Sequence, residues 1–362
     1  MANSDNSENR KYKRWALPKE LGSSFRLAGE IDYCIRMEVG YDTLTANMQD
    51  DNGAFDAWAM ILHAHFGADI TIQLALKESA KNKLTELSQQ NNVHYNRFLY
   101  RLMKFNAFYG DGAPDTAGWF RIADEQLSAE VRRFHDWLSE EGSTFMNNLP
   151  DGEISMDRDG TEDKVEASLS DSSGAVANRK NAILKHKLKT WKNGGMEVET
   201  IFRQLPVGLS TGMDKEVFPG KGAMIDLWAL SKAQDEIAIF ELKANQNKPI
   251  GVISELMFYC NYIYDMFVAP QSQFEARRPI QPKTPEDKKA LRGYDVLWQA
   301  SHSGSLKRVC GYILTDALHS SITRNVLAEM SSSRISYYAV EYQWNHAQRV
   351  EDIQFLSFKK LF

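Results

Sequence analysis

Cysteine is scarce in this sequence. The chain has 362 residues and three cysteines, Cys34, Cys260 and Cys310, which lie far apart. An odd number of isolated cysteines argues against a zinc site built from cysteine thiolates, and it is typical of proteins from a reducing compartment.

Long apolar runs are absent as well. No stretch approaches the ~20 apolar residues that cross a bilayer, and the first residues, MANSDNSENRKYKRW, lack the apolar core of a secretory signal. We therefore expect a cytoplasmic protein with no membrane partner. Hydrophobic residues make up 43% of the chain and charged residues 25%, which predicts a globular protein of two domains with a sizeable core.

Positive charge is not in excess. Lys and Arg number 43 against 48 Asp and Glu, so the net charge is -5 at pH 7. A surface for nucleic acid would therefore have to be a local patch rather than a property of the whole molecule.

Changes in composition divide the chain into four parts. Residues 1–12 are polar and predicted to be a disordered tail, and residues 13–148 are predicted to form an α+β domain without a recognisable motif. Residues 149–177 are predicted to be an acidic linker, because eight acids and two bases fall between residues 151 and 171. Residues 178–362 would then form the second domain.

The N-terminal domain offers few clear signals. Helical patterns occur at 53–67, 78–92 and 128–141, and residues 68–76 alternate like a strand. Residues 94–110 fit either a helix or a strand. His63 and His65 are two residues apart, and we interpret them as core or surface histidines rather than metal ligands.

The second domain has a sharper order of elements. The pattern is a helix, three strands, a helix, a strand, a helix and a strand, at residues 178–195, 198–210, 223–230, 236–244, 251–267, 308–316, 321–330 and 334–344. A strand hairpin followed by crossover helices predicts an α/β fold with a mixed central sheet flanked by helices.

Two acidic residues lie in the hairpin of this sheet. Glu241 and Lys243 share one face of a largely apolar strand, since side chains alternate along a strand. If the hairpin is symmetric about residues 233 and 234, Asp226 lies directly opposite Glu241, with Cβ atoms roughly 4.5–5.5 Å apart. Facing carboxylates repel one another, and a divalent cation between them removes the repulsion.

Oxygen ligands of this kind suit Mg²⁺, which keeps several waters of its own. Asp226 and Glu241, with the backbone carbonyl of Leu242, are therefore the predicted metal ligands, and Mn²⁺ is a predicted substitute. Such a metal polarises a phosphoryl oxygen and lowers the pKa of a bound water. Lys243, on the face of Glu241, is placed to orient the attacking water or to stabilise negative charge in the transition state.

These residues resemble a known family. Asp226, fourteen intervening residues and then Glu241-Leu242-Lys243, on a hairpin followed by a helix, resemble the PD-(D/E)XK nuclease superfamily over about residues 178–345. The resemblance implies a restriction-endonuclease-like core, metal binding by Asp226 and Glu241, and catalytic assistance from Lys243. One branch of the family has a Gln-x-x-x-Tyr motif in the next helix, which implies catalytic roles for Glu255 and Tyr259.

The sequence departs from the family pattern at three points. Ile225 stands where the family name has proline, and Glu255 replaces the glutamine of the branch motif. The helix predicted at the start of the domain contains no acid, although this helix often supplies one in the family. Because of that departure, the sequence leaves it undecided whether a second metal ion binds.

The same helix is strongly basic instead. Residues 178–193 contain no acid, and their bases are Arg179, Lys180, Lys185, Lys187, Lys189 and Lys192. Because proteins contact nucleic-acid phosphates mostly through lysine and arginine, these six residues are predicted to bind nucleic acid. An ordinary solvated helix face is the alternative.

The sequence therefore predicts a hydrolase, a Mg²⁺-dependent nuclease that acts on DNA in defence against foreign DNA or in DNA processing. Whether it is an endonuclease or an exonuclease, and whether RNA is also a substrate, is left open. The N-terminal domain is expected to select the substrate, sense a signal, or bind a second copy or another protein. The alternatives are a catalytically inactive nuclease-like fold that binds nucleic acid or protein, and a hydrolase of a small phosphodiester.

Overall fold

The structure is a computed structural model of the chain. It describes residues 25–28, 34–67, 70–111, 113, 118–150, 160–171, 181–191, 195–212, 215–219, 223–344 and 350–356. The chain divides into two compact units. Unit 1 comprises Met1–Trp137, Pro249–Ser254 and His319–Glu329, and unit 2 comprises Leu138–Lys248, Glu255–Leu318 and Met330–Phe362.

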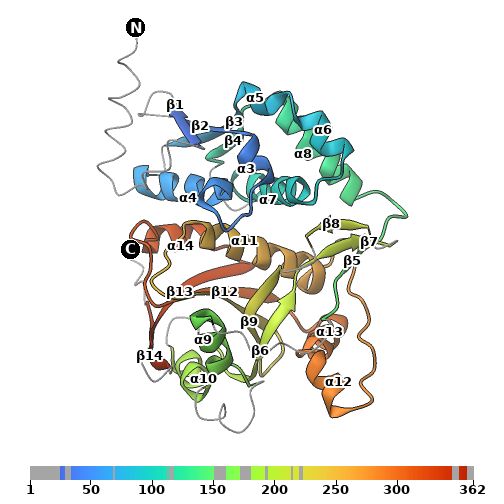
Figure 1. Cartoon of the computed structure of the whole chain (residues 1–362), viewed down its shortest axis with the longest axis vertical. Coiled ribbons are helices and arrows are strands. Elements are labelled where there is room, and N and C mark those ends of the chain that lie inside the picture. Colours follow the sequence, from blue (N-terminus) through green and yellow to red (C-terminus); the bar gives the residue numbers. More distant parts are fainter. Residues whose placement is uncertain are drawn as a thin grey trace. The chain divides into compact units, whose positions relative to one another are not determined.

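Unit 2 is built around a six-stranded sheet in the order β14-β13-β12-β10-β9-β6 (Figure 1). Its strands are β6 (Val198–Pro206), β9 (Met224–Ser231), β10 (Glu236–Lys243), β12 (Arg308–Thr315), β13 (Ile335–Trp344) and β14 (Val350–Phe355). β10, β12 and β13 run parallel, whereas β6, β9 and β14 pair antiparallel with their neighbours. The predicted mixed α/β sheet is confirmed, and the strand β14 was not foreseen.

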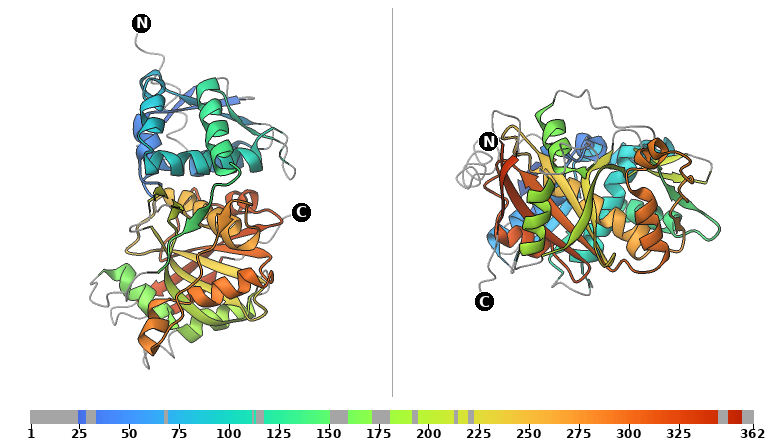
Figure 2. Two further views of the ribbon diagram at one scale, coloured as in Figure 1. Left: turned by 90° about the vertical axis from the view of Figure 1, so that its right-hand side faces the viewer. Right: turned by 90° about the horizontal axis from the view of Figure 1, so that it is seen from below.

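Helices cover both faces of this sheet. α9 (Thr161–Leu169) and α10 (Asn181–Thr190) lie on one face, and α11 (Gly251–Ile263) lies on the other (Figures 1 and 2). Alternation along β9 and β10 directs a set of apolar side chains toward α9 and α10. This core includes Val165, Leu169, Leu184, Leu188, Leu227, Ala229, Ala238, Phe240 and Leu242.

α11 packs closely on the opposite face because β12 carries a glycine there. A Cβ atom added to Gly311 would lie 2.7 Å from Cys260 Sγ and 3.0 Å from Tyr337 Cδ1. Gly311→Ala is therefore expected to lower the free energy of unfolding by about 1–3 kcal/mol, the usual cost of overpacking a filled core. Urea denaturation measures this loss.

Gly212→Ala is the matched control, since a Cβ there meets nothing within 4 Å. Its free energy of unfolding should stay within about 0.5 kcal/mol of the wild type. Equal stability of the two alanine variants would show that α11 does not pack on β12 in this way.

Unit 2 also contains smaller elements between and beside the strands of the large sheet. A second sheet has the order β11-β5-β7-β8, formed by Phe274–Glu275, Phe145–Asn147, Leu209–Thr211 and Glu216–Phe218. α11 continues into a π-helical turn, η3 (Tyr264–Val268), and two further helices, α12 (Pro285–Ala290) and α13 (Tyr294–His302), precede β12. The predicted helix 251–267 covers α11 and most of η3, and the predicted strand 198–210 extends from β6 to the first residues of β7. The other elements of this group were not predicted.

Unit 1 contains a four-stranded sheet, β1-β2-β3-β4, and several helices. The strands are Phe25–Ala28, Cys34–Val39, Thr71–Leu76 and Phe120–Ile122. The helices are α3 (Tyr41–Thr45), η1 (Asp51–Gly53), α4 (Phe55–Phe66), α5 (Glu78–Lys81), α6 (Leu84–Gln89), α7 (Val93–Tyr109), α8 (Glu125–Leu138) and α14 (Arg324–Met330). The ambiguous stretch 94–110 is thus a helix, and the single helix predicted at 78–92 is two short ones.

The division between the units differs from the predicted domain boundaries. Part of the predicted linker 149–177 is helix α9, whose Val165 and Leu169 are fully buried in the core of unit 2. Val165 and Leu169 are four residues apart, as on one face of a helix, but acids surround them in the sequence. The average composition of the segment therefore indicated a linker. In addition, residues 249–254 and 319–329 of the predicted second domain belong to unit 1. The predicted tail, residues 1–12, lies outside the described residues.

Candidate active site

The hairpin of β9 and β10 has the predicted register. Its ladder runs from Ile237 opposite Leu230 to Phe240 opposite Leu227, and the next position in this register sets Asp226 against Glu241. Beyond the ladder, Asp226 Oδ2 accepts a hydrogen bond of 2.8 Å from the backbone N–H of Leu242.

The other predicted catalytic residues meet at the end of β10. Lys243 Nζ lies 2.6 Å from Glu241 Oε1 and 3.1 Å from Glu255 Oε2. The hydroxyl of Tyr259, one turn further along α11, donates to Glu255 Oε1 at 3.0 Å. Lys243 is 8% exposed, and Glu241, Glu255 and Tyr259 are each at most 2% exposed. The structure thus brings these four residues into one buried hydrogen-bonded chain.

The electrostatics of this cluster are dominated by burial and by like charge. Burial raises the pKa of Asp226 well above its usual value, and the nearby Glu166 carboxyl raises it further. Burial also raises the pKa of Glu241, as do the neighbouring carboxyls of Asp226 and Glu255. Burial alone would lower the pKa of Lys243, but the surrounding acids outweigh it, so the pKa of this ammonium is raised. Lys243 is therefore a stable cation at neutral pH.

One oxygen of the cluster has no partner. Glu241 Oε2 is buried and accepts no hydrogen bond within the described part of the chain, and an unsatisfied buried acceptor is costly. The Asp226 carboxyl is close enough to raise the pKa of Glu241. Two neighbouring carboxyls with one unused oxygen form a set of hard oxygen donors, which suits Mg²⁺ or Mn²⁺. Within the described residues, no group of three or more His, Cys, Asp or Glu is arranged to hold a metal, so backbone carbonyl and water would have to complete the coordination.

Two acids of α9 escaped the sequence prediction. Glu166 accepts hydrogen bonds from Arg203 Nε at 2.7 Å and from Gln204 Nε2 at 2.9 Å. Glu162 is close enough to Lys243 to interact with it electrostatically, although burial raises the pKa of Glu162 overall. Of the two helices on this face of the sheet, α10 contains no acid, whereas α9 contributes Glu162 near Lys243 and Glu166 near Asp226. A signal was present, since Glu162 and Glu166 are four residues apart, beside the apolar pair of α9.

Gln204 has an unusual backbone conformation next to this site. It adopts φ 56° within β6, in the left-handed region that few residues other than glycine occupy. Its neighbours Arg203 and Leu205 pair with Leu227 and Ile225 of β9, so Gln204 falls at the position opposite Asp226. Strained backbone of this kind gathers at functional sites.

The three lysines of the basic helix that the structure describes are each paired with an acid. Lys185 pairs with Asp171 at 2.8 Å, Lys187 with Asp352 at 3.1 Å, and Lys189 with Glu197 at 2.9 Å. To contact a phosphate, each lysine would have to give up its acidic partner. Arg179, Lys180 and Lys192 lie outside the described residues. Nucleic-acid binding by α10 therefore stays a prediction, and these ion pairs do not favour it.

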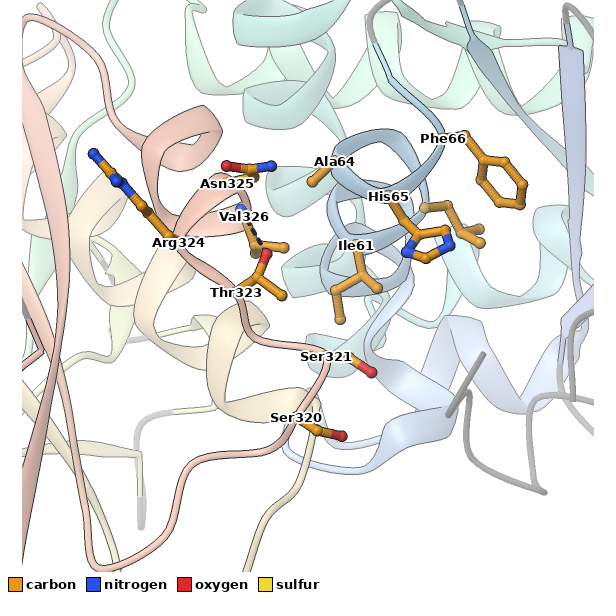
Figure 3. A pocket seen from close by; sticks show the side chains of 11 residues that line it. Ile61, Ala64, His65, Phe66, Ser320, Ser321, Thr323, Arg324, Asn325 and Val326 are labelled. Carbon is orange, nitrogen blue, oxygen red and sulfur yellow. Dashed lines mark hydrogen bonds between the residues drawn. The ribbon is translucent and has the colours of Figure 1, made fainter. Parts of the chain in front are cut away.

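The side chains of His63 and His65 in α4 have different neighbours. His63 Nδ1 lies 2.8 Å from Glu329 Oε2, and its ring stacks on Trp119. His65 instead lines a cavity of about 450 Å³ in unit 1, across from Ser320 and Ser321 (Figure 3). The two imidazoles therefore do not form a shared site.

Comparison of the chain with protein-family models, with curated proteins and with solved structures finds no match. Among the described residues, no helix has the combination of length and apolar character that is needed to cross a membrane.

Proposed function

We propose that unit 2 is a metal-dependent nuclease with a restriction-endonuclease-like core that hydrolyses phosphodiester bonds in DNA. The observation that carries this proposal is the cluster of half-buried Asp226 with buried Glu241 and Lys243, and its unpartnered Glu241 oxygen. The arrangement of strands supports it, because the acids lie on a hairpin whose second strand pairs with parallel strands.

A structural role alone does not account for this cluster. Burying an ionised group costs several kcal/mol even when it has a partner, and apolar residues of similar size usually serve stability as well or better. Here Asp226, Glu241 and Glu255 surround the single ammonium of Lys243. Ionisable groups with strongly shifted pKa values at one site are typical of catalytic centres.

The residues of the cluster would divide the work as follows. Asp226, Glu241 and the carbonyl of Leu242 would hold Mg²⁺ or Mn²⁺, which when bound polarises a phosphoryl oxygen and acidifies a water. Lys243 is expected to stabilise negative charge rather than to accept a proton, because its raised pKa keeps it protonated. Glu255 positions Lys243, and Tyr259 positions Glu255.

A second function, a nuclease-like fold that binds without cutting, is favoured by one contact. Lys243 Nζ engages both Glu241 and Glu255, so the cluster partly neutralises itself without a metal. Metal affinity separates the two functions, because only the catalytic one requires Mn²⁺ or Mg²⁺ at Asp226.

The decisive experiment incubates the purified chain with plasmid, linear duplex, single-stranded DNA and RNA, each with Mg²⁺, Mn²⁺ or chelator. We expect DNA cleavage with either metal and none with chelator. Titration calorimetry with Mn²⁺ measures binding in parallel. Cleavage that persists in chelator contradicts the metal-dependent mechanism, and absence of both cleavage and Mn²⁺ binding favours the binding-only function.

A further inference from the structure

The segment between η3 and β12 has a charge opposite to that of the chain as a whole. Residues 276–307, which include α12 and α13, are called the basic hairpin here. They contain seven bases, Arg277, Arg278, Lys283, Lys288, Lys289, Arg292 and Lys307, and three acids, Glu286, Asp287 and Asp295. The whole chain has a net charge of -5, so the positive charge is concentrated locally.

Much of this charge is exposed and uncompensated. Arg278, Lys283, Lys288, Lys289 and Lys307 are all exposed, and within the described parts of the chain their side chains form no ion pair. One of the two acids of α12 is already engaged, because the Asp287 carboxylate accepts hydrogen bonds from the backbone of Lys283 and Thr284. The lysines of α10, by contrast, are each paired with an acid.

The basic hairpin is fixed beside the carboxylate site. Arg292, between α12 and α13, donates through Nη1 to the backbone oxygen of Gln204 at 3.0 Å and contacts Met224 Sδ at 3.7 Å. Gln204 occupies the position opposite Asp226, and Met224 precedes Asp226 by two residues. The basic hairpin is therefore attached to the ends of β6 and β9 at which Asp226, the predicted metal ligand, lies.

Close packing makes this attachment firm. Gly293 has φ 83° and lies directly on the ring of Phe202, where an added Cβ would approach ring carbons to 2.5 Å. The Tyr294 hydroxyl donates to the backbone oxygen of Arg277 at 2.6 Å. β6 is an edge strand of the large sheet, and Figure 2 shows α12 and α13 alongside this edge.

An aromatic ring also orients one of the exposed bases. The guanidinium of Arg278 lies over the ring of Trp298, 5.9 Å from its centroid, and Trp298 is held by a 3.2 Å hydrogen bond to the oxygen of Ala276. A cation–π contact restrains the arginine without neutralising it. Its charge stays available to an anion.

We infer that the basic hairpin binds the phosphate backbone of duplex DNA beside the carboxylate site. The inference rests on the proposed function for its substrate. Exposed bases without acidic partners can replace the counterions of DNA, whereas paired lysines must first lose a partner. Because phosphate contacts are independent of base sequence, this surface would hold the duplex without selecting a sequence.

The test compares two triple variants that remove equal charge. Lys283, Lys288 and Lys289 are changed to serine in one variant, and Lys185, Lys187 and Lys189 in the other. Affinity for a labelled DNA duplex is measured by fluorescence anisotropy over a salt series, with chelator present to prevent cleavage. The slope of log K against log salt should flatten by up to about 2.7 in the hairpin variant, at ~0.9 per phosphate contact.

The slope of the α10 variant should match that of the wild type. Circular dichroism of both variants verifies the fold, which exposed lysines do not determine. An unchanged slope in the hairpin variant, a flattened slope in the α10 variant, or tighter binding to an RNA duplex overturns the inference. Binding by the wild type that does not depend on salt overturns it too.

These outcomes are separable from failure of the proposed function. If the wild type binds DNA through the hairpin but never cleaves it with Mg²⁺ or Mn²⁺, the inference stands and the nuclease proposal falls. If the wild type cleaves DNA while the hairpin variant keeps the wild-type slope, the nuclease proposal stands and the inference falls.

Discussion

Glu241→Gln and Asp226→Asn are each expected to lower the rate of DNA cleavage at least about 100-fold. Substitution of groups that merely support a metal ligand typically costs 10–100-fold, and these two side chains are the proposed ligands themselves. The amides are nearly the same size as the acids but carry no charge, so they bind a hard cation poorly. Initial rates of plasmid nicking at saturating Mg²⁺ measure the effect.

Glu236→Gln is the matched control for this loss. Glu236 begins the same strand, β10, and its carboxylate pairs with Arg308 at 2.9 Å rather than with the cluster. The control should cut at the wild-type rate. Unaltered cleavage by folded Glu241→Gln and Asp226→Asn would place the active site elsewhere.

The same Asp226→Asn variant is expected to be more stable than the wild type at neutral pH. The pKa of Asp226 in the folded state is raised above its usual value of 3.8. The stability that this carboxyl contributes is therefore fully present below pH 3.8, and it is lost as the pH rises through the raised pKa. Asparagine carries no charge to desolvate. Its advantage in urea denaturation should therefore be present at pH 7 and vanish in acid, and an advantage that grows in acid would contradict this account.

Arg101→Met is expected to lower the stability of unit 1 by about 3–5 kcal/mol, the usual cost of leaving a buried charge without its partner. Arg101 Nε lies 3.0 Å from Asp56 Oδ2, and its Nη2 lies 2.5 Å from Asp56 Oδ1 and 2.9 Å from the oxygen of Gly53. Arg101 is 5% exposed and Asp56 is 2% exposed. Methionine fills similar space but leaves the carboxylate of Asp56 unpaired.

Two companion variants test the cause of this loss. The double variant Arg101→Met and Asp56→Leu should recover most of the stability, because replacing both members of a buried pair with apolar residues is often neutral. Lys83→Met removes the half-exposed pair with Glu86 and should cost less than about 1 kcal/mol. Urea unfolding, followed by far-ultraviolet circular dichroism, compares all three. Equal losses from Arg101→Met and Lys83→Met would show that burial of the Asp56 pair contributes nothing.

The Asp56 pair also bears on the helix that carries Glu255. Ser254 Oγ donates to Asp56 Oδ1, and Ser254 precedes Glu255 directly in α11. The first turn of this helix belongs to unit 1 and its continuation to unit 2. A helix assigned by its sequence pattern to one domain therefore serves both units.

The sequence by itself determined the elements that depend on local pattern. Alternating and continuous apolar runs predicted β6, β9, β10, β12 and β13, since strand periodicity is a property of adjacent residues. The turn between β9 and β10 is short, so its position defined the register, which pairs Phe240 with Leu227 and, one position further on, would set Asp226 against Glu241. The helix after this hairpin placed Glu255 and Tyr259 on one face for the same reason, because they are four residues apart.

Only the tertiary structure decided which charges belong together. The partner of Lys187 is Asp352, 165 residues away, and no local pattern reveals that this lysine is neutralised. Likewise, Glu166 reaches the site through Arg203 and Gln204 of a later strand, although composition indicated a linker. Whether a charged side chain can meet a ligand depends on its neighbours in space, and these are set by packing between segments that are far apart in the chain.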